Sequence, residues 1–224
     1  MDSLKLFNKN EFVYFSMKIE GVRNKETNKV NKVSRFPKGG YKNLQESVIF
    51  DDNHTIIAIR TGIISNIFVI DIDDLNNEIS KKLNNICFDN CKWKVKTRKG
   101  YHYYFKYDER LNIYDKQSKA SNINNQLGFD TRGNGGIIFT GTYILENQEI
   151  KYELISENPS LIEMNNEIFE YVKLLLEPTI NGKTEIIKNK TINIGIKYDG
   201  VINNINEEEM IKYIECLDDK HFLS

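Results

Sequence analysis

Most hydrophobic residues of this chain fall into short runs that are typical of β-strands. The run at 66–72 is almost continuously apolar, as expected for a strand that is buried on both faces. Glycines in the segments 98–100 and 133–136 predict tight turns. The strands that we expect are 11–19, 55–60, 66–72, 92–97, 101–107, 127–131 and 136–140.

Two further segments have the spacing of helices. In the first, over 75–86, apolar residues recur every three or four positions, and Asp74 is placed to cap its N-terminus. The second spans 165–176 and is expected to stop at Pro178. The apolar stripe of the first helix consists of Leu75, Ile79, Leu83 and Ile86.

Polar segments suggest how the chain is organised. Residues 20–47 are polar and basic, and residues 108–126 are irregular and predict an exposed loop. Beyond Pro178 the composition becomes low in complexity, until Asn206 is placed to cap a last, acidic helix. We therefore expect a main domain over 1–178, a linker or peripheral hairpin over 179–205, and the start of a truncated helical linker region over 206–224.

The composition narrows the class of protein. The 224 residues, 40% of them apolar, can bury the core of one large domain, and a formal charge of −1 gives no general basic field. Three cysteines are too few for a disulfide framework, and Cys87 and Cys91 lack a second ligand pair, so no zinc is expected. No segment resembles a signal peptide or a membrane span, which predicts a cytoplasmic protein with no membrane partner.

Asp71 and Asp73 close the most apolar strand. Residues two apart in a strand project from the same face, and two such carboxylates repel each other unless cations lie between them. Mg²⁺ prefers oxygen ligands and often keeps substrate phosphates in its shell, so this pair favours a metal–triphosphate site. Glycosyltransferases and haloacid-dehalogenase phosphatases share the spacing, and Asp73 would alternatively open the next helix. The phosphatases require Thr or Val where this chain has Leu75.

His102 lies in a later strand, directly after a basic turn. Thr97, Arg98 and Lys99 precede a glycine that lets the backbone approach a ligand, and all three can contact phosphate oxygens. Lysines alternate with other residues along 92–97, so one face of that strand is cationic. An ordinary solvated edge strand would show the same alternation.

Asp130 precedes a glycine-rich turn that contains Arg132. An Asp beside Gly often bonds its own backbone, but Asp130 is also suited to be a third metal ligand, with Arg132 neutralising phosphate charge. The segments 67–74, 96–105 and 128–139 each have an ordinary explanation when taken alone. Together, a paired acid, a strand histidine and a third acid favour one site for metal-dependent nucleotidyl transfer.

In this order the three segments resemble the motifs of the primase–polymerase branch of the archaeo-eukaryotic primase superfamily. An apolar strand ending in Asp-x-Asp is matched by Asp71 and Asp73, and a small residue followed by x-His is matched by 100–102. An acid before Arg-Gly-x-Gly-Gly is matched by 130–136. The resemblance covers about residues 10–155 and is to N-terminal domains of large-DNA-virus primase–helicases and to plasmid or phage enzymes.

The resemblance implies an α+β fold, the archaeo-eukaryotic primase fold, in which an RRM-like sheet carries the acids and packs against a second α/β module. It implies attack of a 3′-hydroxyl on the α-phosphate of an NTP or dNTP, with two Mg²⁺ or Mn²⁺ ions. The implied metal ligands are Asp71, Asp73 and Asp130. The implied nucleotide contacts are His102, Lys99 and Arg132, with Thr97 and Arg60 as weaker candidates.

The resemblance also implies partners. Single-stranded DNA template and primer would lie on the basic stretches 18–42 and 92–99, and a superfamily-3 helicase would follow in a longer viral protein. Such a protein would work in the host cytoplasm or a viral replication compartment. Two departures are Gly100, where the family often has Ser, and the absence of a Cys/His zinc insertion.

Two alternatives from other classes remain at this point. A non-catalytic RRM-like module would stack single-stranded bases on the aromatic residues at 101–105. Another metal-dependent phosphotransferase, such as a nuclease or a nucleotide cyclase, would use the same acids. No residue can be assigned to discrimination between ribose and deoxyribose.

Overall fold

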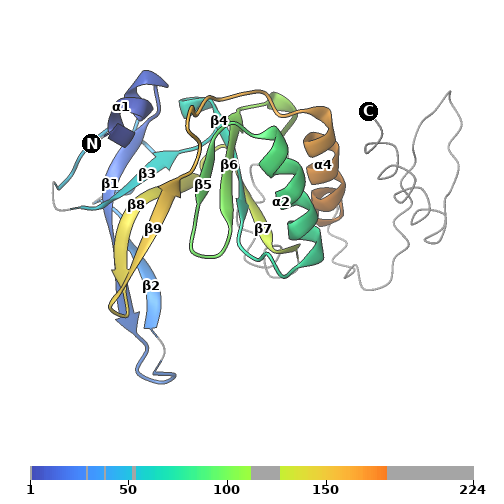
Figure 1. The fold of residues 1–224 in the computed structure, drawn as a ribbon. Coiled ribbons are helices and arrows are strands. Elements are labelled where there is room, and N and C mark those ends of the chain that lie inside the picture. The colour runs from blue at the N-terminus through green and yellow to red at the C-terminus, as the bar shows by residue number, and fades with distance from the viewer. Residues whose placement is uncertain (1, 29, 38, 52–53, 112–126, 181–224) are drawn as a thin grey trace, which may run out of the picture. The chain divides into compact units, whose positions relative to one another are not determined.

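The computed structural model describes residues 2–28, 30–37, 39–51, 54–111 and 127–180, and all of these lie in one compact unit (Figure 1). The predicted linker over 179–205 beyond Ile180, the helical region over 206–224 and most of the loop over 108–126 therefore lie outside the described residues. Within the described part, no helix is long and apolar enough to cross a membrane.

The described residues form a mixed α+β fold around one curled, antiparallel sheet. Its nine strands lie in the order β2-β1-β3-β8-β9-β5-β6-β4-β7. The strands are β1 (Tyr14–Arg23), β2 (Val30–Arg35), β3 (Ile56–Arg60), β4 (Ile67–Ile72), β5 (Lys94–Lys96), β6 (Tyr101–Lys106), β7 (Phe129–Arg132), β8 (Ile137–Leu145) and β9 (Gln148–Leu154). The helices are α1 (Asp2–Lys9), the 3-10 helix η1 (Ile63–Ser65), α2 (Glu78–Asn90) and α4 (Asn166–Ile180).

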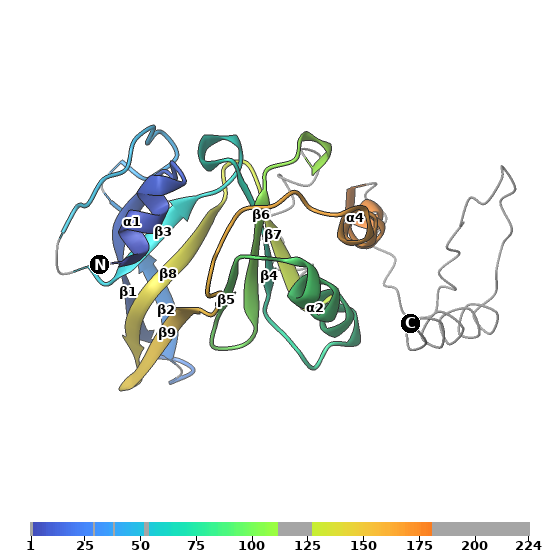
Figure 2. The same cartoon turned by 45° about the horizontal axis from the view of Figure 1, so that its top comes forward.

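The sheet consists of two halves, and the chain passes between their strands twice, from β3 to β4 and from β7 to β8. Figure 2 shows β1, β2, β3, β8 and β9 on one side and β4 to β7 on the other. The link from β3 to β4 and the link from β7 to β8 run side by side. Thr61 holds them together, because its N–H donates to the Gly136 carbonyl at 3.0 Å and its hydroxyl donates to the Gly133 carbonyl at 2.6 Å. This junction and the direct pairing of β5 with β9 together join the two halves.

Strand β4 is buried along its whole length, as its apolar sequence predicted. Alternate residues of a strand face opposite sides, so β4 contributes to two cores. Phe68, Ile70 and Ile72 pack with residues of α2 and α4, which cover one face of this half (Figure 1). Ile67 and Val69 pack on the other face with Trp93 and residues of β1 and α1. Asp71 shares that second face, at the end away from α1.

Helix α2 begins three residues later than expected. Its cap is Asn77, whose side-chain oxygen accepts from the N–H groups of Ile79 and Ser80. The prediction of Asp74 as the cap was wrong, because the N–H groups of Asp73 and Asp74 both donate to the Gly128 carbonyl beside β7, and residues 75–76 form a turn before the helix begins. Leu75 accordingly lies outside the apolar stripe and is exposed.

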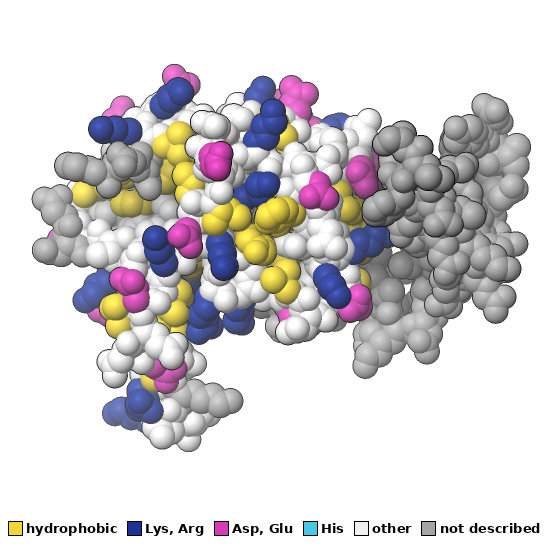
Figure 3. All heavy atoms as spheres, in the orientation of Figure 1, with side chains coloured by type: hydrophobic (Ala, Val, Ile, Leu, Met, Phe, Trp, Pro, Cys, Tyr) yellow, Lys and Arg dark blue, Asp and Glu magenta, His cyan; other side chains and the backbone are white. Residues whose placement is uncertain are grey.

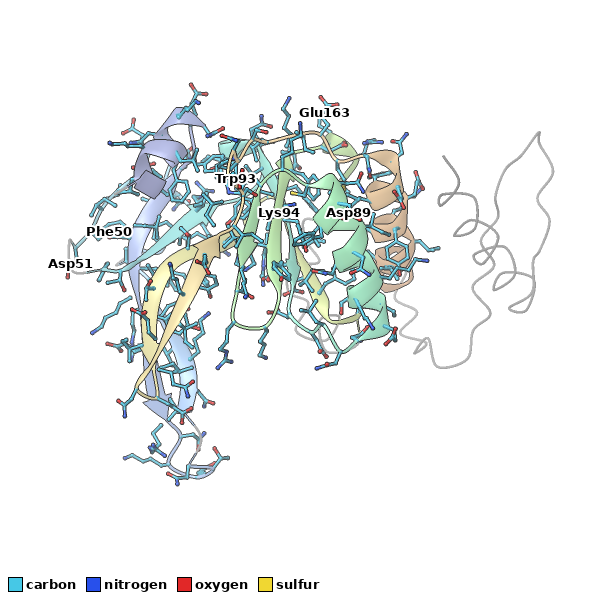
Figure 4. The ribbon with its side chains drawn as sticks, in the orientation of Figure 1. Phe50, Asp51, Asp89, Trp93, Lys94 and Glu163 are labelled. Carbon is cyan, nitrogen blue, oxygen red and sulfur yellow. The ribbon has the colours of Figure 1, made fainter. Side chains whose placement is uncertain are left out.

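The predicted hairpin at 92–107 is confirmed, with Thr97 N donating to the Gly100 carbonyl across its turn. Its first strand, β5, is not an edge strand, because it pairs with both β6 and β9. Lys94 lies beside the end of α2 (Figure 4), where its ammonium donates to the Phe88 carbonyl at 2.8 Å. On the face of the molecule seen in Figure 3, exposed apolar side chains (yellow) gather near the middle, and basic side chains lie around them.

Some elements were missed by the sequence pattern. The apolar spacing did not predict α1, β2 or β9. Strands β7 and β8 are not paired with each other, because the turn between them carries the chain from one half of the sheet to the other. Helix α4 also continues past Pro178 to Ile180. A proline removes one backbone hydrogen bond, and so close to the end of a helix that loss need not end it.

Candidate functional site

Three of the predicted residues stand in one row across the sheet. Asp71 on β4 pairs with His102 on β6 and, on its other side, with Asp130 on β7. Directly paired residues of an antiparallel ladder project from the same face, so the three side chains meet. The neighbouring residues Ile72, Tyr103 and Phe129 face the helices instead, which anchors the row in a rigid layer.

The row is buried and held by charge. Asp71, His102 and Asp130 are 7%, 4% and 7% exposed. Nε2 of His102 lies 3.2 Å from Oδ1 of Asp71. Nη2 of Arg132 lies 3.4 Å from Oδ2 of Asp71 and donates to Oδ2 of Asp130 at 2.9 Å. Burial alone would raise the pKa of Asp71, but His102 and Arg132 outweigh it and hold that pKa below its usual value.

Arg132 occupies the position between the two carboxylates of the row. It extends from β7, two residues beyond Asp130, and so reaches the same face. Of the described residues, no three His, Cys, Asp or Glu side chains are grouped so as to hold a single ion. Asp71 and Asp130 offer hard oxygen donors, which suit Mg²⁺ or Mn²⁺, but both now contact a guanidinium.

The row opens into a pocket of about 420 Å³ between the two halves of the sheet. Asp73 lines this pocket, as do Thr97, Lys99 and Arg132, so most of the predicted site is brought together. Asp130 does not line it, but contacts Arg132, which does. Arg60 is placed elsewhere: it is not among the lining residues, and its guanidinium donates to the Leu44 carbonyl.

The opposite wall of the pocket was not predicted. It comes from β8 and β9 and is mostly apolar and aromatic, with Phe139, Tyr143 and Tyr152 as its largest residues. The ring of Tyr152 stacks on the imidazole of His102 with centroids 5.4 Å apart, which joins the two halves across the pocket. No spacing in the sequence signals this contact, because it depends on the curl of the sheet.

Lys32 also lines the pocket, although its strand was missed. The basic stretch 18–42 contains it, but nothing in that stretch distinguishes Lys32 from its neighbours. Burial lowers the pKa of its ammonium, and the negative charges of Asp71 and Asp73 oppose that change. The pocket is therefore lined by four basic side chains and two acids: Lys32, Arg98, Lys99 and Arg132 with Asp71 and Asp73.

Gly100 sets the position of the basic turn against β4. A Cβ atom at this residue would lie 2.1 Å from the carbonyl oxygen of Ile72, far inside van der Waals contact. A serine, which the resembled family often carries here, would therefore force the turn and β4 apart in this chain. The glycine thus brings Thr97 and Lys99 close to the strand that carries Asp71.

No family model matches the chain, and the comparisons with curated proteins and with solved structures also give no match.

Proposed function

We propose that this chain is a primase–polymerase, which adds nucleotides to a 3′-end on a DNA template. The observation that carries the proposal is the row of Asp71, His102 and Asp130 at one end of a mainly cationic pocket. Acids suited to hard cations, next to a surplus of basic side chains, fit a substrate that is a metal-bound polyphosphate.

The acids and the basic residues would have separate roles. Asp71, Asp73 and Asp130 would hold the divalent ions, which when bound supply Lewis-acid stabilisation of the phosphate oxygens. Since Arg132 contacts both Asp71 and Asp130, it would turn toward the phosphates as the ions arrive. His102, Thr97 and Lys99 would bind the triphosphate, whose charge grows on the departing pyrophosphate as the new bond to the α-phosphorus forms.

The strand order supports the same class of enzyme. Strands β4 and β5 are parallel and joined through α2, with the antiparallel β6 between them, and β7 pairs on the other side of β4. This order is that of ferredoxin-like and RRM-like sheets, the module expected to carry the acids in the archaeo-eukaryotic primase fold. The half made of β1, β2, β3, β8 and β9 would be the second module.

The burial of the aromatic residues argues against a module that only binds single strands. Tyr103, Tyr104 and Phe105 are 0–1% exposed, so no base can stack on them. The buried acids would also repel a polyanion unless cations were bound. Single-stranded DNA would instead contact the basic stretches 18–42 and 92–99 through its phosphates, apart from Lys94, whose ammonium is engaged at the end of α2.

One assay separates the candidate activities. The protein is incubated with an unprimed single-stranded DNA template, labelled NTP or dNTP, and Mg²⁺ or Mn²⁺. New oligonucleotides indicate a primase, and products that form only after a primer is added indicate a polymerase. Shortening of the template indicates a nuclease, and binding without turnover would refute catalysis altogether. Parallel reactions with NTP and dNTP measure the sugar preference.

A further inference from the structure

Lys32 occupies an unusual place for a lysine of an edge strand. Strand β2 is the outermost strand of its half, yet the ammonium of Lys32 reaches over β8 to β9 and into the wall of the pocket. It lies 5.1 Å from the ring centroids of both Phe139 and Tyr143, and 5.7 Å from that of Tyr152. Three aromatic rings therefore lie within 6 Å of one ammonium, although Lys32 as a whole residue remains exposed to solvent.

The sheet register brings the three aromatic residues around this ammonium together. Phe139 and Tyr143 lie on one face of β8, with Gly141 between them, and Gly141 pairs with Tyr152 on β9. Gly141 contributes no side chain between the two rings, and the position of an added Cβ is already taken by the Thr55 carbonyl oxygen, 2.1 Å away. The β1–β2 hairpin comes close to β8 at Gly21, where an added Cβ would lie 2.9 Å from the side chain of Leu145. Because Lys32 pairs with Gly21 on β1, this close approach brings Lys32 near the rings of β8.

The hydrogen bonding of Lys32 is incomplete. An ammonium has three N–H donors, and the aromatic rings accept none of them as a full hydrogen bond. Within the described part of the chain, Nζ donates one hydrogen bond, to the hydroxyl of Tyr152 at 3.0 Å. Its remaining donors are available to a ligand in the pocket. The ring of Tyr152 also stacks on His102, so Lys32 and His102 are held by the same side chain.

We propose that Lys32 is a phosphate-binding residue of the nucleotide pocket, supplied by the β1–β2 hairpin and positioned by the aromatic residues Phe139, Tyr143 and Tyr152. This inference rests on the proposed function for the identity of the nucleotide, but the chemistry that it requires is only a polyphosphate. The hairpin is then part of the substrate site, and β1 and β2 do more than extend the sheet. Tyr152 is a positioning residue for both Lys32 and His102.

The test measures binding of inorganic tripolyphosphate and of ATP, with Mg²⁺, to the full chain by calorimetry. Lys32→Gln should weaken both affinities about 10- to 100-fold, as expected for the loss of a charged hydrogen bond. Lys32→Arg should retain most of the affinity. Tyr152→Phe keeps the stacked ring but removes the acceptor of Lys32, and should weaken binding about threefold. The matched control is Lys151→Gln, which removes an exposed lysine paired with Glu153, away from the pocket.

Several outcomes would overturn the inference. Equal affinities for Lys32→Gln and Lys151→Gln would do so, as would a Lys32→Gln variant that loses thermal stability but binds tripolyphosphate normally. Loss of affinity for single-stranded DNA alone would reassign Lys32 to the template. The proposed function fails separately. If the chain binds tripolyphosphate through Lys32 but adds no nucleotides, the phosphate site stands and the polymerase activity is refuted. If Lys32→Gln adds nucleotides with an unchanged KM for the nucleotide, only the role of Lys32 in phosphate binding is refuted.

Discussion

Asp71 and Asp130 stand directly opposite each other on β4 and β7, and the same nitrogen, Nη2 of Arg132, contacts a carboxylate oxygen of each. Two buried carboxylates side by side would repel, and the guanidinium makes the arrangement stable. The same two carboxylates are the proposed metal ligands. The guanidinium and the proposed metal ions therefore bind the same carboxylate oxygens, and each can supply the positive charge that the two acids need.

Substitution of the acids should abolish nucleotide addition and leave the fold intact. Asp71→Ala or Asp73→Ala should lower the rate by at least about 100-fold, because each removes a ligand that acts on developing charge. Asp71→Ala should lower the thermal stability moderately, because buried His102 loses its partner, but the fold should remain since Arg132 keeps Asp130. Asp89→Ala, on the exposed surface of α2, is the matched control. Full activity in a well-folded Asp71→Ala/Asp130→Ala variant would refute the site.

Gly100→Ala should destabilise the protein through a steric clash. Its Cβ would lie 2.1 Å from the Ile72 carbonyl oxygen, and relieving this contact requires a backbone shift that costs about 2 kcal/mol or more. Gly135→Ala is the comparison, because Gly135 has open space around it and only its φ of 75° opposes a side chain, at a cost of about 1 kcal/mol. Urea unfolding measures both. Equal stabilities for the two variants would contradict the steric explanation.

The two buried cysteines should be unreactive in the folded protein. Burial raises the pKa of Cys91 to about 11 and also raises that of Cys87, so the thiolate that reacts with alkylating reagents is scarce at pH 8. Since Cys216 lies outside the described residues, the measurement uses a Cys216→Ser background. Alkylation should be slowed on the order of 100-fold relative to the same variant in urea. Rapid modification of the native variant would contradict this prediction.

The sequence predicted the part of the site that depends on alternation within strands. The spacing of Asp71 and Asp73, and the position of His102 inside a strand, determine which face each side chain occupies, and local sequence encodes that face. Pairing between strands is not encoded locally. The direct contact of His102 with Asp71 follows from the register of β4 and β6, which is set by packing across many residues.

Contacts across the curl of the sheet could not be predicted for the same reason. Tyr152 reaches His102, and Lys32 reaches Tyr152, over separations of 50 and 120 residues. Arg60 shows the reverse error. Its place before the first motif suggested a nucleotide contact, but its strand belongs to the other half of the sheet, and its guanidinium is directed to Leu44.

Lys94→Ala should cost stability and leave DNA binding unchanged. The ammonium donates to a carbonyl in the last turn of α2 and lies 4.4 Å from the ring centroid of Phe88, so its removal should cost about 1 kcal/mol. Lys96→Ala, two residues along the same strand and exposed, should leave stability unchanged. Chemical unfolding and single-strand binding measure the two effects. If Lys94→Ala weakened DNA binding and Lys96→Ala did not, Lys94 would be a residue of the surface that contacts the template.

Arg132→Gln should convert the site into one that needs metal or acid for its stability. In the native protein the pKa of Asp71 is lowered, so the resulting stabilisation is complete above the unfolded-state pKa of about 4 and is lost as the pH falls through the lower, folded-state pKa. Without the guanidinium, Asp71 and Asp130 repel each other, so the free energy of unfolding of the variant at pH 7 should fall by about 1–3 kcal/mol. This loss is smaller than that for breaking a fully buried ion pair, because Arg132 is partly exposed.

The difference between Arg132→Gln and the native protein should therefore narrow as the pH falls below about 4, where the carboxyls become protonated. Mg²⁺ at pH 7 should have a similar effect, because an ion held by the same oxygens replaces the lost positive charge. Thermal unfolding should then show a larger upward shift with Mg²⁺ for the variant than for the native protein. Arg110→Gln, whose guanidinium pairs with Asp108 away from the pocket, controls for the loss of an arginine. If Mg²⁺ raised the unfolding temperature of Arg132→Gln and of Arg110→Gln by the same amount, Arg132 and the metal would not share ligands.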